Sequence, residues 1–213
     1  MSQIPKPIFL ELAGLPVAGK TTTASLLVDE LTKRGLRCIV VPEAAAISPL
    51  SHLKLNWQFN AWTLCQAVAS ILEHGARPSH DLVVLDRGLV DALCWVRWFR
   101  LTDGIEGATA DALESFARVK TWYETCNLVV ILRVKFETAL KRRGQTGRIV
   151  NLQSFRELHE AYDATLKDLR TDPLVKHIAM LDTDNLSPSE VIYWTLDRLN
   201  DLWPRLGKNT GSQ

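Results

Sequence analysis

The stretch Gly14-Leu15-Pro16-Val17-Ala18-Gly19-Lys20-Thr21 reads G-x-x-x-x-G-K-T, which is the Walker A pattern. Residues 7–13 before it form a short apolar run typical of a buried strand, and residues 22–34 after it repeat apolar side chains with helical spacing, up to Gly35. A strand, a glycine-rich loop and a helix N-terminus point backbone N–H groups at one place, where the helix dipole favours negative charge. The stretch therefore predicts a phosphate site for a nucleoside triphosphate.

Two side chains of this stretch have predicted roles of their own. Lys20 is expected to reach the β- and γ-phosphates, and the Thr21 hydroxyl to hold Mg²⁺. ATP as the donor and Mg²⁺ are thus the expected cofactors. The predicted nucleotide-binding residues of this stretch are Gly14, Ala18, Gly19, Lys20, Thr21 and Thr22.

Length and charge narrow the class of protein. At 213 residues the chain is expected to form a single α/β domain over residues 1–206, with a disordered tail at 207–213. The 25 Lys and Arg residues nearly balance the 24 Asp and Glu residues, so we expect no nucleic-acid partner and no anionic membrane partner. The longest apolar stretches are strand-sized and fall short of the roughly 20 residues of a membrane span.

The first residues of the chain and its four cysteines predict the cellular compartment of the protein. The first residues, 1–6, do not have the apolar region of a signal peptide. The four cysteines are far apart in the sequence and form no C-x-x-C pair, which argues against a zinc site or a disulfide framework. We therefore expect buried free thiols in a reducing cytoplasm.

Strand-like and helix-like segments alternate along the whole chain. This alternation predicts right-handed crossovers and a three-layer, doubly wound α/β fold with a parallel five-stranded sheet, in which ligands bind at the carboxyl ends of the strands. Besides the first strand and helix, the expected strands are 36–41, 81–86, 127–132 and 177–181, and the expected helices are 53–74, 90–101, 109–124, 136–143, 152–170 and 187–202.

Charged side chains follow the second and third expected strands. Glu43 comes after the second strand, and Asp86 and Arg87 end the third. Asp86 is placed like a Walker B carboxylate that holds Mg²⁺, although an Asp there can also cap the next helix. Arg87 can clamp a phosphate with two hydrogen bonds, or it can pair with Glu43 or Asp91 as a structural bridge. These two interpretations of Arg87 are compatible.

A basic, glycine-containing segment predicts a mobile lid near residues 141–150. Arginines on such a lid would move over the transferring phosphoryl group when substrates bind. A solvated charge run at a helix C-terminus is the alternative interpretation, because the helix dipole also favours cations there. The cluster consists of Lys141, Arg142, Arg143 and Arg148 around Gly144 and Gly147.

The chain has seven tryptophans, many for its length. Aromatic side chains either line a pocket for a planar ligand or fill the core, and the sequence leaves both open. Five of them lie between residues 57 and 122: Trp57, Trp62, Trp95, Trp98 and Trp122.

Taken together, these motifs resemble the deoxynucleoside kinase and thymidylate kinase superfamily. The likeness rests on the P-loop, the Pro42-Glu43 and Asp86-Arg87 strand ends, the arginine-rich segment and the helix that contains Leu158-His159-Glu160-Ala161-Tyr162. It covers about residues 7–200. The resemblance implies that Glu43 acts as general base on an acceptor hydroxyl. It further implies that Asp86 and Arg87 bind the metal and the reacting oxygens, and that some of Arg142, Arg143 and Arg148 grip the donor phosphates.

The chain departs from the nucleoside kinase pattern at two places. Asp86-Arg87-Gly88 with Asp91 is more similar to nicotinamide-riboside-kinase-like proteins than to the Asp/Glu-Arg-Ser of nucleoside kinases. The glutamine that reads the base in nucleoside kinases has no clear counterpart: Trp62 lies near its place and Gln66 one turn further on. The expected acceptor-binding residues are Glu43, Trp57, Trp62, Gln66, Arg87 and Asp91.

A third departure concerns the acceptor. Thymidylate kinases carry an arginine next to the Pro-Glu pair, where it holds the phosphate of the acceptor. The stretch Val41-Pro42-Glu43-Ala44 has none. This departure favours a hydroxyl acceptor and leaves the base unassigned.

The sequence thus predicts an ATP- and Mg²⁺-dependent kinase that phosphorylates a hydroxyl of a small nucleoside or nucleoside-like acceptor. The alternatives are a thymidylate-kinase-like monophosphate kinase and, from another class, a P-loop switch that acts on a protein partner. By analogy with related kinases a homodimer through the Trp95/Trp98 helix is also an expectation. The predicted catalytic residues are Glu43, Lys20, Arg87, Arg142 and Arg148.

Overall fold

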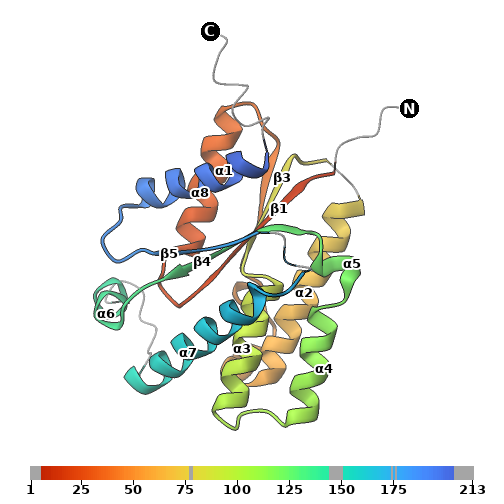
Figure 1. Ribbon diagram of the computed structural model, residues 1–213, viewed down its shortest axis with the longest axis vertical. Helices are drawn as coiled ribbons and strands as arrows, with labels where there is room; N and C mark the ends of the chain where they lie inside the picture. Colours follow the sequence, from red (N-terminus) through yellow and green to blue (C-terminus); the bar gives the residue numbers. More distant parts are fainter. Residues whose placement is uncertain (1–5, 77–78, 144–150, 174, 176, 204–213) are drawn as a thin grey trace.

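Five strands form one parallel sheet in the computed structural model, which describes residues 6–76, 79–143, 151–173, 175 and 177–203 (Figure 1). The strand order is β2-β3-β1-β4-β5. The strands are β1 (Ile8–Gly14), β2 (Cys38–Val41), β3 (Leu82–Asp86), β4 (Cys126–Arg133) and β5 (Ile178–Asp182). This sheet confirms the predicted doubly wound α/β class.

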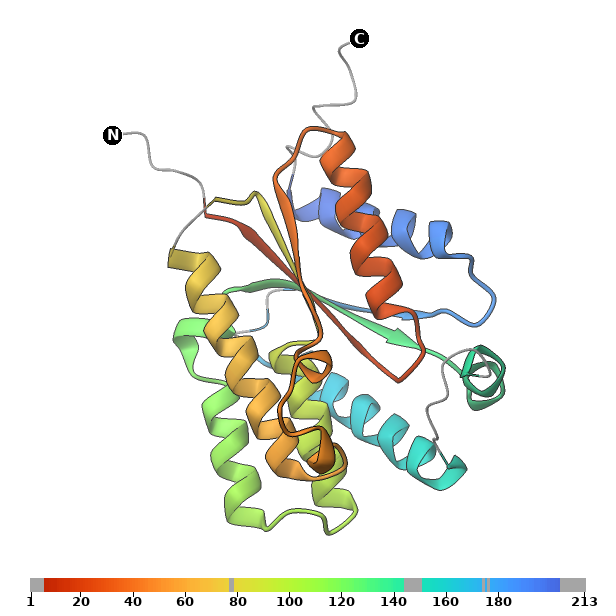
Figure 2. The ribbon, with the colours of Figure 1, turned by 180° about the vertical axis from the view of Figure 1, so that it is seen from behind.

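Helices cover both faces of the sheet, so the domain has three layers (Figures 1 and 2). On one face lie α1 (Lys20–Lys33) and α8 (Pro188–Leu202), which contact each other. The other face carries α2 (Trp57–Ala76), α3 (Leu89–Leu101), α4 (Gly107–Ala117), α5 (Lys120–Tyr123) and α7 (Leu152–Leu169), and α3 packs directly against β1. Shorter elements are η1 (Ala44–Ala46), η2 (Ser51–Leu53) and α6 (Phe136–Arg143).

The register of the sheet brings the predicted site residues to one edge. All five residues of β3 are buried, as expected for a central parallel strand with helices on both faces. Leu12 pairs with Asp86, and Val41 pairs with Leu85, so β1, β2 and β3 end side by side. The P-loop, Glu43 and Asp86 therefore leave the sheet at the same edge.

Two helix predictions were wrong in detail. The helix expected over 109–124 is broken at Arg118 and Val119 into α4 and α5, because the indole N–H of Trp122 donates to the Phe116 carbonyl at 2.9 Å and Arg118 pairs with Asp172 at 3.1 Å. The helix expected from residue 53 begins at Trp57 instead, after two short 3-10 turns. The break between α4 and α5 thus depends on contacts beyond the local helical pattern.

Other expectations had mixed outcomes. All four cysteines are free, but Cys65 is exposed on α2 and only Cys94 and Cys126 are buried, so the expectation of four buried thiols was wrong. Among the described helices, none is long and apolar enough to cross a membrane. Most of the predicted lid, 144–150, and the predicted tail, 207–213, lie outside the described residues.

Gly14→Ala is expected to lower the free energy of unfolding by about 3 kcal/mol or more. Gly14 has a φ of 138°, and a Cβ there would lie 2.0 Å from the backbone oxygen of Leu132 on β4. Gly35→Ala is the matched control, because Gly35 also has a positive φ, 82°, but its Cβ position meets nothing within 4 Å. We expect that control to lose about 1 kcal/mol. Equal losses in denaturant unfolding would contradict a steric role for Gly14.

Candidate active site

The P-loop connects the end of β1 to the start of α1. Gly19 is the N-cap of α1 with a φ of 101°, and it supplies no side-chain hydrogen bond to the first turn. The first amide groups of α1 therefore remain available to an anion. Thr21 and Thr22 are exposed on that turn, whereas Ala18 is buried and can offer only its backbone.

Lys20 is folded back onto its own loop. Its Nζ donates to the carbonyl oxygens of Gly14 and Leu15, at 2.8 Å each, and the residue is only 5% exposed. Burial, and then the nearby Arg87 cation, lower the pKa of Lys20 to about 7, although the neighbouring carboxylates oppose this shift. The ammonium is thus held where an incoming phosphate would be its stronger partner.

Thr21 and Asp86 form a pair suited to Mg²⁺. The Thr21 hydroxyl donates to Asp86 Oδ2 at 2.6 Å, while Asp86 Oδ1 is buried and lacks a hydrogen-bond partner within the part of the chain that the structure describes. Burial raises the pKa of Asp86, and the Thr21 hydrogen bond and Lys20 oppose that shift. A cation would satisfy the orphaned oxygen, and Mg²⁺ bound to phosphates needs only one or two carboxylates. The described residues contain no cluster of three or more His, Cys, Asp or Glu that could hold a metal ion.

The alternative role of Asp86 as a helix cap was wrong. The N-cap of α3 is Gly88, and no side chain caps the helix from that position. The Asp86 carboxylate is directed at Thr21 instead.

Arg87 joins the ends of β1, β2 and β3. Its Nε donates to Glu43 Oε1 at 2.8 Å, and its Nη1 donates to Asp91 Oδ2 at 2.6 Å and to the Gly14 carbonyl at 3.4 Å. The structural-bridge interpretation of Arg87 is therefore confirmed. Its backbone has a φ of 71°, unusual for a residue other than glycine, which marks a conformation that the surroundings must hold.

Asp91 is 2% exposed and is occupied by protein groups. Besides Arg87, it accepts the N–H of Gly14 at 3.0 Å and the hydroxyl of Tyr162 at 2.6 Å. Burial disfavours its charge, but Arg87, Lys20 and these hydrogen bonds lower its pKa below the usual range. Asp91 lines the cavity described below, and its hydrogen bonds hold Arg87 and the start of the P-loop.

Two residues of this network were absent from the predicted site. Tyr162 on α7 donates to both the Gly14 carbonyl, at 3.1 Å, and Asp91. Glu11 in β1 is fully buried, and its carboxylate accepts the N–H groups of Val90 and Asp91. The only sequence signal for Glu11 was a charged residue in the middle of an apolar strand.

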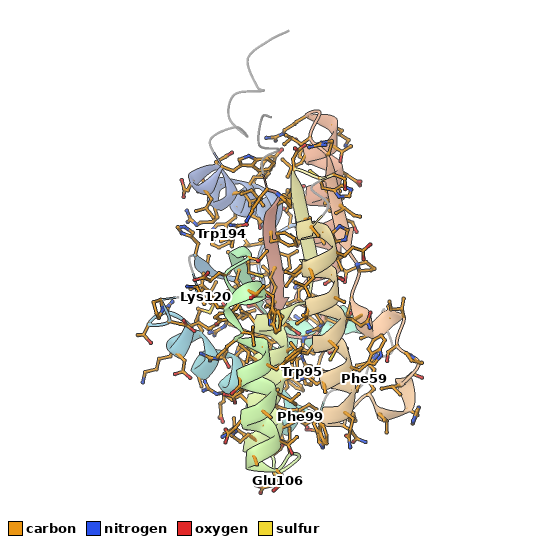
Figure 3. All side chains as sticks on the ribbon, turned by 90° about the vertical axis from the view of Figure 1, so that its right-hand side faces the viewer. Phe59, Trp95, Phe99, Glu106, Lys120 and Trp194 are labelled. Atoms are coloured by element: carbon orange, nitrogen blue, oxygen red, sulfur yellow. The ribbon has the colours of Figure 1, made fainter. Side chains whose placement is uncertain are left out.

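A cavity of 640 Å³ opens beside Glu43 and Arg87. Its walls come from β2, α2 and α3, and they are mainly apolar. Figure 3 shows three aromatic residues of these walls, Phe59 on α2 and Trp95 and Phe99 on α3, near the helical end of the molecule. A cavity of this size and character suits a small organic molecule.

The predicted acceptor-binding residues divide into two groups at this cavity. Glu43, Arg87, Asp91 and Gln66 line it. Among the described residues around it, Trp57 and Trp62 are not part of the lining, and Trp95 is the tryptophan that is. Helix α2 therefore turns Gln66, one turn after Trp62, toward the cavity.

Only one of the predicted lid arginines has a described side chain. Arg142 on α6 donates to the Thr183 hydroxyl at 3.0 Å, to the Thr183 carbonyl at 2.5 Å and to the Val17 carbonyl of the P-loop at 3.4 Å. Arg142 therefore already contacts the P-loop in this structure. The Arg143 side chain and Arg148 lie outside the described part of the chain.

Comparison with solved structures identifies the fold. A deoxyadenosine kinase from M. mycoides with bound dATP superimposes with a TM-score of 0.68 and 16% identity, covering 91% of this chain and 100% of that one. The chain has the fold of a deoxynucleoside kinase. The same kinase with the products dCMP and a flexible dCDP gives a TM-score of 0.69 at 15% identity, and with bound dCTP 0.65 at 16%, with the same coverage. No protein-family model and no curated protein sequence matches.

ATP binding is expected to take up protons above pH 7. Lys20 with a pKa of about 7 is largely neutral there in the free protein, and a bound triphosphate favours its charged form. The affinity should therefore fall by up to about tenfold per pH unit between about pH 7 and 9. Calorimetric titration in two buffers of different ionisation enthalpy measures the uptake, and Lys20→Ala is the control that should lack it. A pH-independent affinity without proton uptake would contradict the prediction.

Proposed function

We propose that this protein is an ATP- and Mg²⁺-dependent kinase that transfers the γ-phosphoryl group to a hydroxyl of a nucleoside or nucleoside-like acceptor. The observation that carries the proposal is the Glu43 carboxylate, which lines the acceptor cavity and is joined through Arg87 to Gly14 of the P-loop. A base between the acceptor and the donor site is the arrangement that hydroxyl phosphorylation requires. The shared fold with a deoxyadenosine kinase supports the same reaction class.

The proposed chemistry is positioning combined with electrostatics. The α1 amides and Lys20 would bind the β- and γ-phosphates of the donor. Thr21 and Asp86 would hold Mg²⁺, which supplies charge neutralisation at the phosphates. Glu43 would orient the acceptor hydroxyl and take its proton. Its Oε1 is engaged by Arg87, and no hydrogen bond from the described residues reaches Oε2, so Oε2 is the atom proposed to accept that proton.

The charges around the cavity favour a hydroxyl over a phosphate acceptor. Glu43 would repel an acceptor phosphate, and Arg87 is already paired with Glu43 and Asp91. The other lysine or arginine of the described lining is Lys54, an exposed residue. Lys54 is the one observation in favour of the second candidate, a nucleoside monophosphate kinase.

The test is a stoichiometric transfer assay with γ-labelled ATP. Nucleosides and nucleoside monophosphates are offered separately, and phosphate release is measured without any acceptor. We expect transfer to at least one nucleoside, with little release in its absence. Transfer to monophosphates alone would support the second candidate, and release without transfer to any acceptor would support a P-loop switch.

A further inference from the structure

The first turn of α3 carries the central part of the site but has no cap of its own. Helix starts leave amide groups without partners, and a polar side chain at the N-cap normally accepts them. Here the N-cap is Gly88, which has no side chain, and Leu89, Val90 and Asp91 are all buried. Another acceptor must therefore satisfy these amides.

Glu11 supplies that acceptor from the middle of β1. Its Oε2 accepts the N–H of Val90 at 3.1 Å, and its Oε1 accepts the N–H of Asp91 at 2.8 Å. The Cys126 thiol on β4 lies 3.8 Å from Oε2 as a third donor. A buried carboxylate is costly unless it is hydrogen-bonded, and the positive end of a helix dipole favours it further. The Glu11 side chain thus caps the start of α3, although it lies 80 residues from Asp91 in the sequence.

Glu11 and the glycine at position 88 depend on each other. A Cβ at residue 88 would lie 2.7 Å from the carboxyl carbon of Glu11 and 2.8 Å from its Oε2. A serine there, as in the Asp/Glu-Arg-Ser pattern of nucleoside kinases, would collide with Glu11 while competing for the same amides. In this chain the cap of α3 therefore comes from β1 and not from residue 88.

The turn that Glu11 holds determines where the reactive groups stand. Arg87 precedes this turn and binds Glu43, while Asp91 lies within it and binds both Arg87 and the Gly14 amide. We propose that Glu11 is a positioning residue for phosphoryl transfer, which caps α3 and thereby aligns the Arg87–Asp91 pair with Glu43 and the P-loop. This inference rests on the proposed kinase function.

Three variants test the exchange of caps: Glu11→Ala, Gly88→Ser and the double variant. Glu11→Ala should reduce kcat by about 10- to 100-fold with a much smaller change in KM for ATP, because alignment rather than donor binding is lost. Gly88→Ser should also be impaired, through the collision. In the double variant the serine gains both space and the free amides, so kcat should return to within about threefold of the unmodified protein.

The outcomes separate this role from a purely structural one. Wild-type kcat in Glu11→Ala, or a folded double variant no more active than Glu11→Ala, would overturn the proposal. So would melting temperatures that fall in both single variants and recover in the double while kcat stays constant. If Glu11→Ala does not fold, Glu11→Gln replaces it, since glutamine keeps the shape of the side chain but leaves one of the two amides without an acceptor.

A readout that needs no activity keeps this inference distinct from the proposed function. Amide hydrogen exchange at Val90 and Asp91 should accelerate in Glu11→Ala or Glu11→Gln and slow again in the double variant. Unchanged protection would overturn the capping role itself. If the unmodified protein transfers phosphoryl to no acceptor, the proposed function fails, and the exchange data still decide whether Glu11 holds α3.

Discussion

Lys20→Ala is expected to reduce phosphoryl transfer by about 10³-fold or more while the protein stays folded. The ammonium is held directly at the predicted phosphate site, 2.8 Å from the carbonyl oxygens of Gly14 and Leu15. Its removal takes away a charge that offsets the negative charge growing on the transferred group. Single-turnover transfer from γ-labelled ATP measures the loss.

The stability of this variant should change little. Alanine loses two hydrogen bonds but also removes the cost of burying a charge. Linkage gives a second expectation: because burial lowers the pKa of Lys20 from 10.5 to about 7, the unfolded state binds the extra proton between these values. Ligand-free stability should therefore rise with pH from about 7 to 10.5, and this rise should be smaller in Lys20→Ala.

Lys33→Ala is the matched control, since Lys33 is exposed at the other end of the same helix. It should keep transfer at the wild-type rate. Near wild-type transfer in Lys20→Ala as well would show that the P-loop assignment is wrong.

Glu43→Gln is expected to reduce transfer to a nucleoside hydroxyl by roughly 10²- to 10⁴-fold. A neutral hydroxyl must lose its proton as it attacks, and glutamine cannot take that proton. Glutamine keeps an oxygen that can accept the Arg87 Nε–H, which Glu43 Oε1 accepts at 2.8 Å, so the geometry around Arg87 should persist. The affinity for ATP and the melting temperature should therefore stay close to those of the unmodified protein.

The control for this variant is Glu30→Gln. Glu30 pairs with Arg34 on α1, away from the cavity, and its loss should leave kcat unchanged. Full activity in Glu43→Gln would remove Glu43 from the mechanism. Robust phosphorylation of a monophosphate but of no nucleoside would instead favour the monophosphate kinase.

Several features were predictable because they depend on neighbouring residues. The strand, loop and helix around 14–21 follow from a contiguous motif, and Gly35 ends α1 with the positive φ that glycine permits. The start of α8 was predictable for the same reason, because Ser187 and Glu190 form a reciprocal capping box within one turn. Hydrogen bonds between residues this close in the chain require particular residue types at fixed spacings, so the sequence predicts them.

Other features were not predictable because distant residues decide them. The tryptophan that faces the cavity is Trp95, not Trp57 or Trp62, and this depends on the rotation of α2 and α3 against the sheet. The break after Ala117 depends on Arg118 meeting Asp172, 54 residues further on. Neither the orientation of Trp95 nor the Arg118–Asp172 pair follows from a repeat in the sequence.

The sequence by itself determined that this chain folds as a parallel α/β sheet with a phosphate loop and with Glu43, Asp86 and Arg87 at the ends of its strands. Only the tertiary structure decided how these groups are held. Arg87 pairs with the carboxylates of Glu43 and Asp91, and Asp91 accepts hydrogen bonds from Gly14 and Tyr162. Glu11 accepts the amide groups at the start of α3. The reason is physical. A motif records contacts within a few residues, whereas Arg87 and Glu43 are 44 residues apart. The hydrogen bonds of Asp91 to Gly14 and Tyr162, and of Glu11 to the start of α3, join positions 71 to 80 residues apart, which meet only when β1, α3 and α7 pack together.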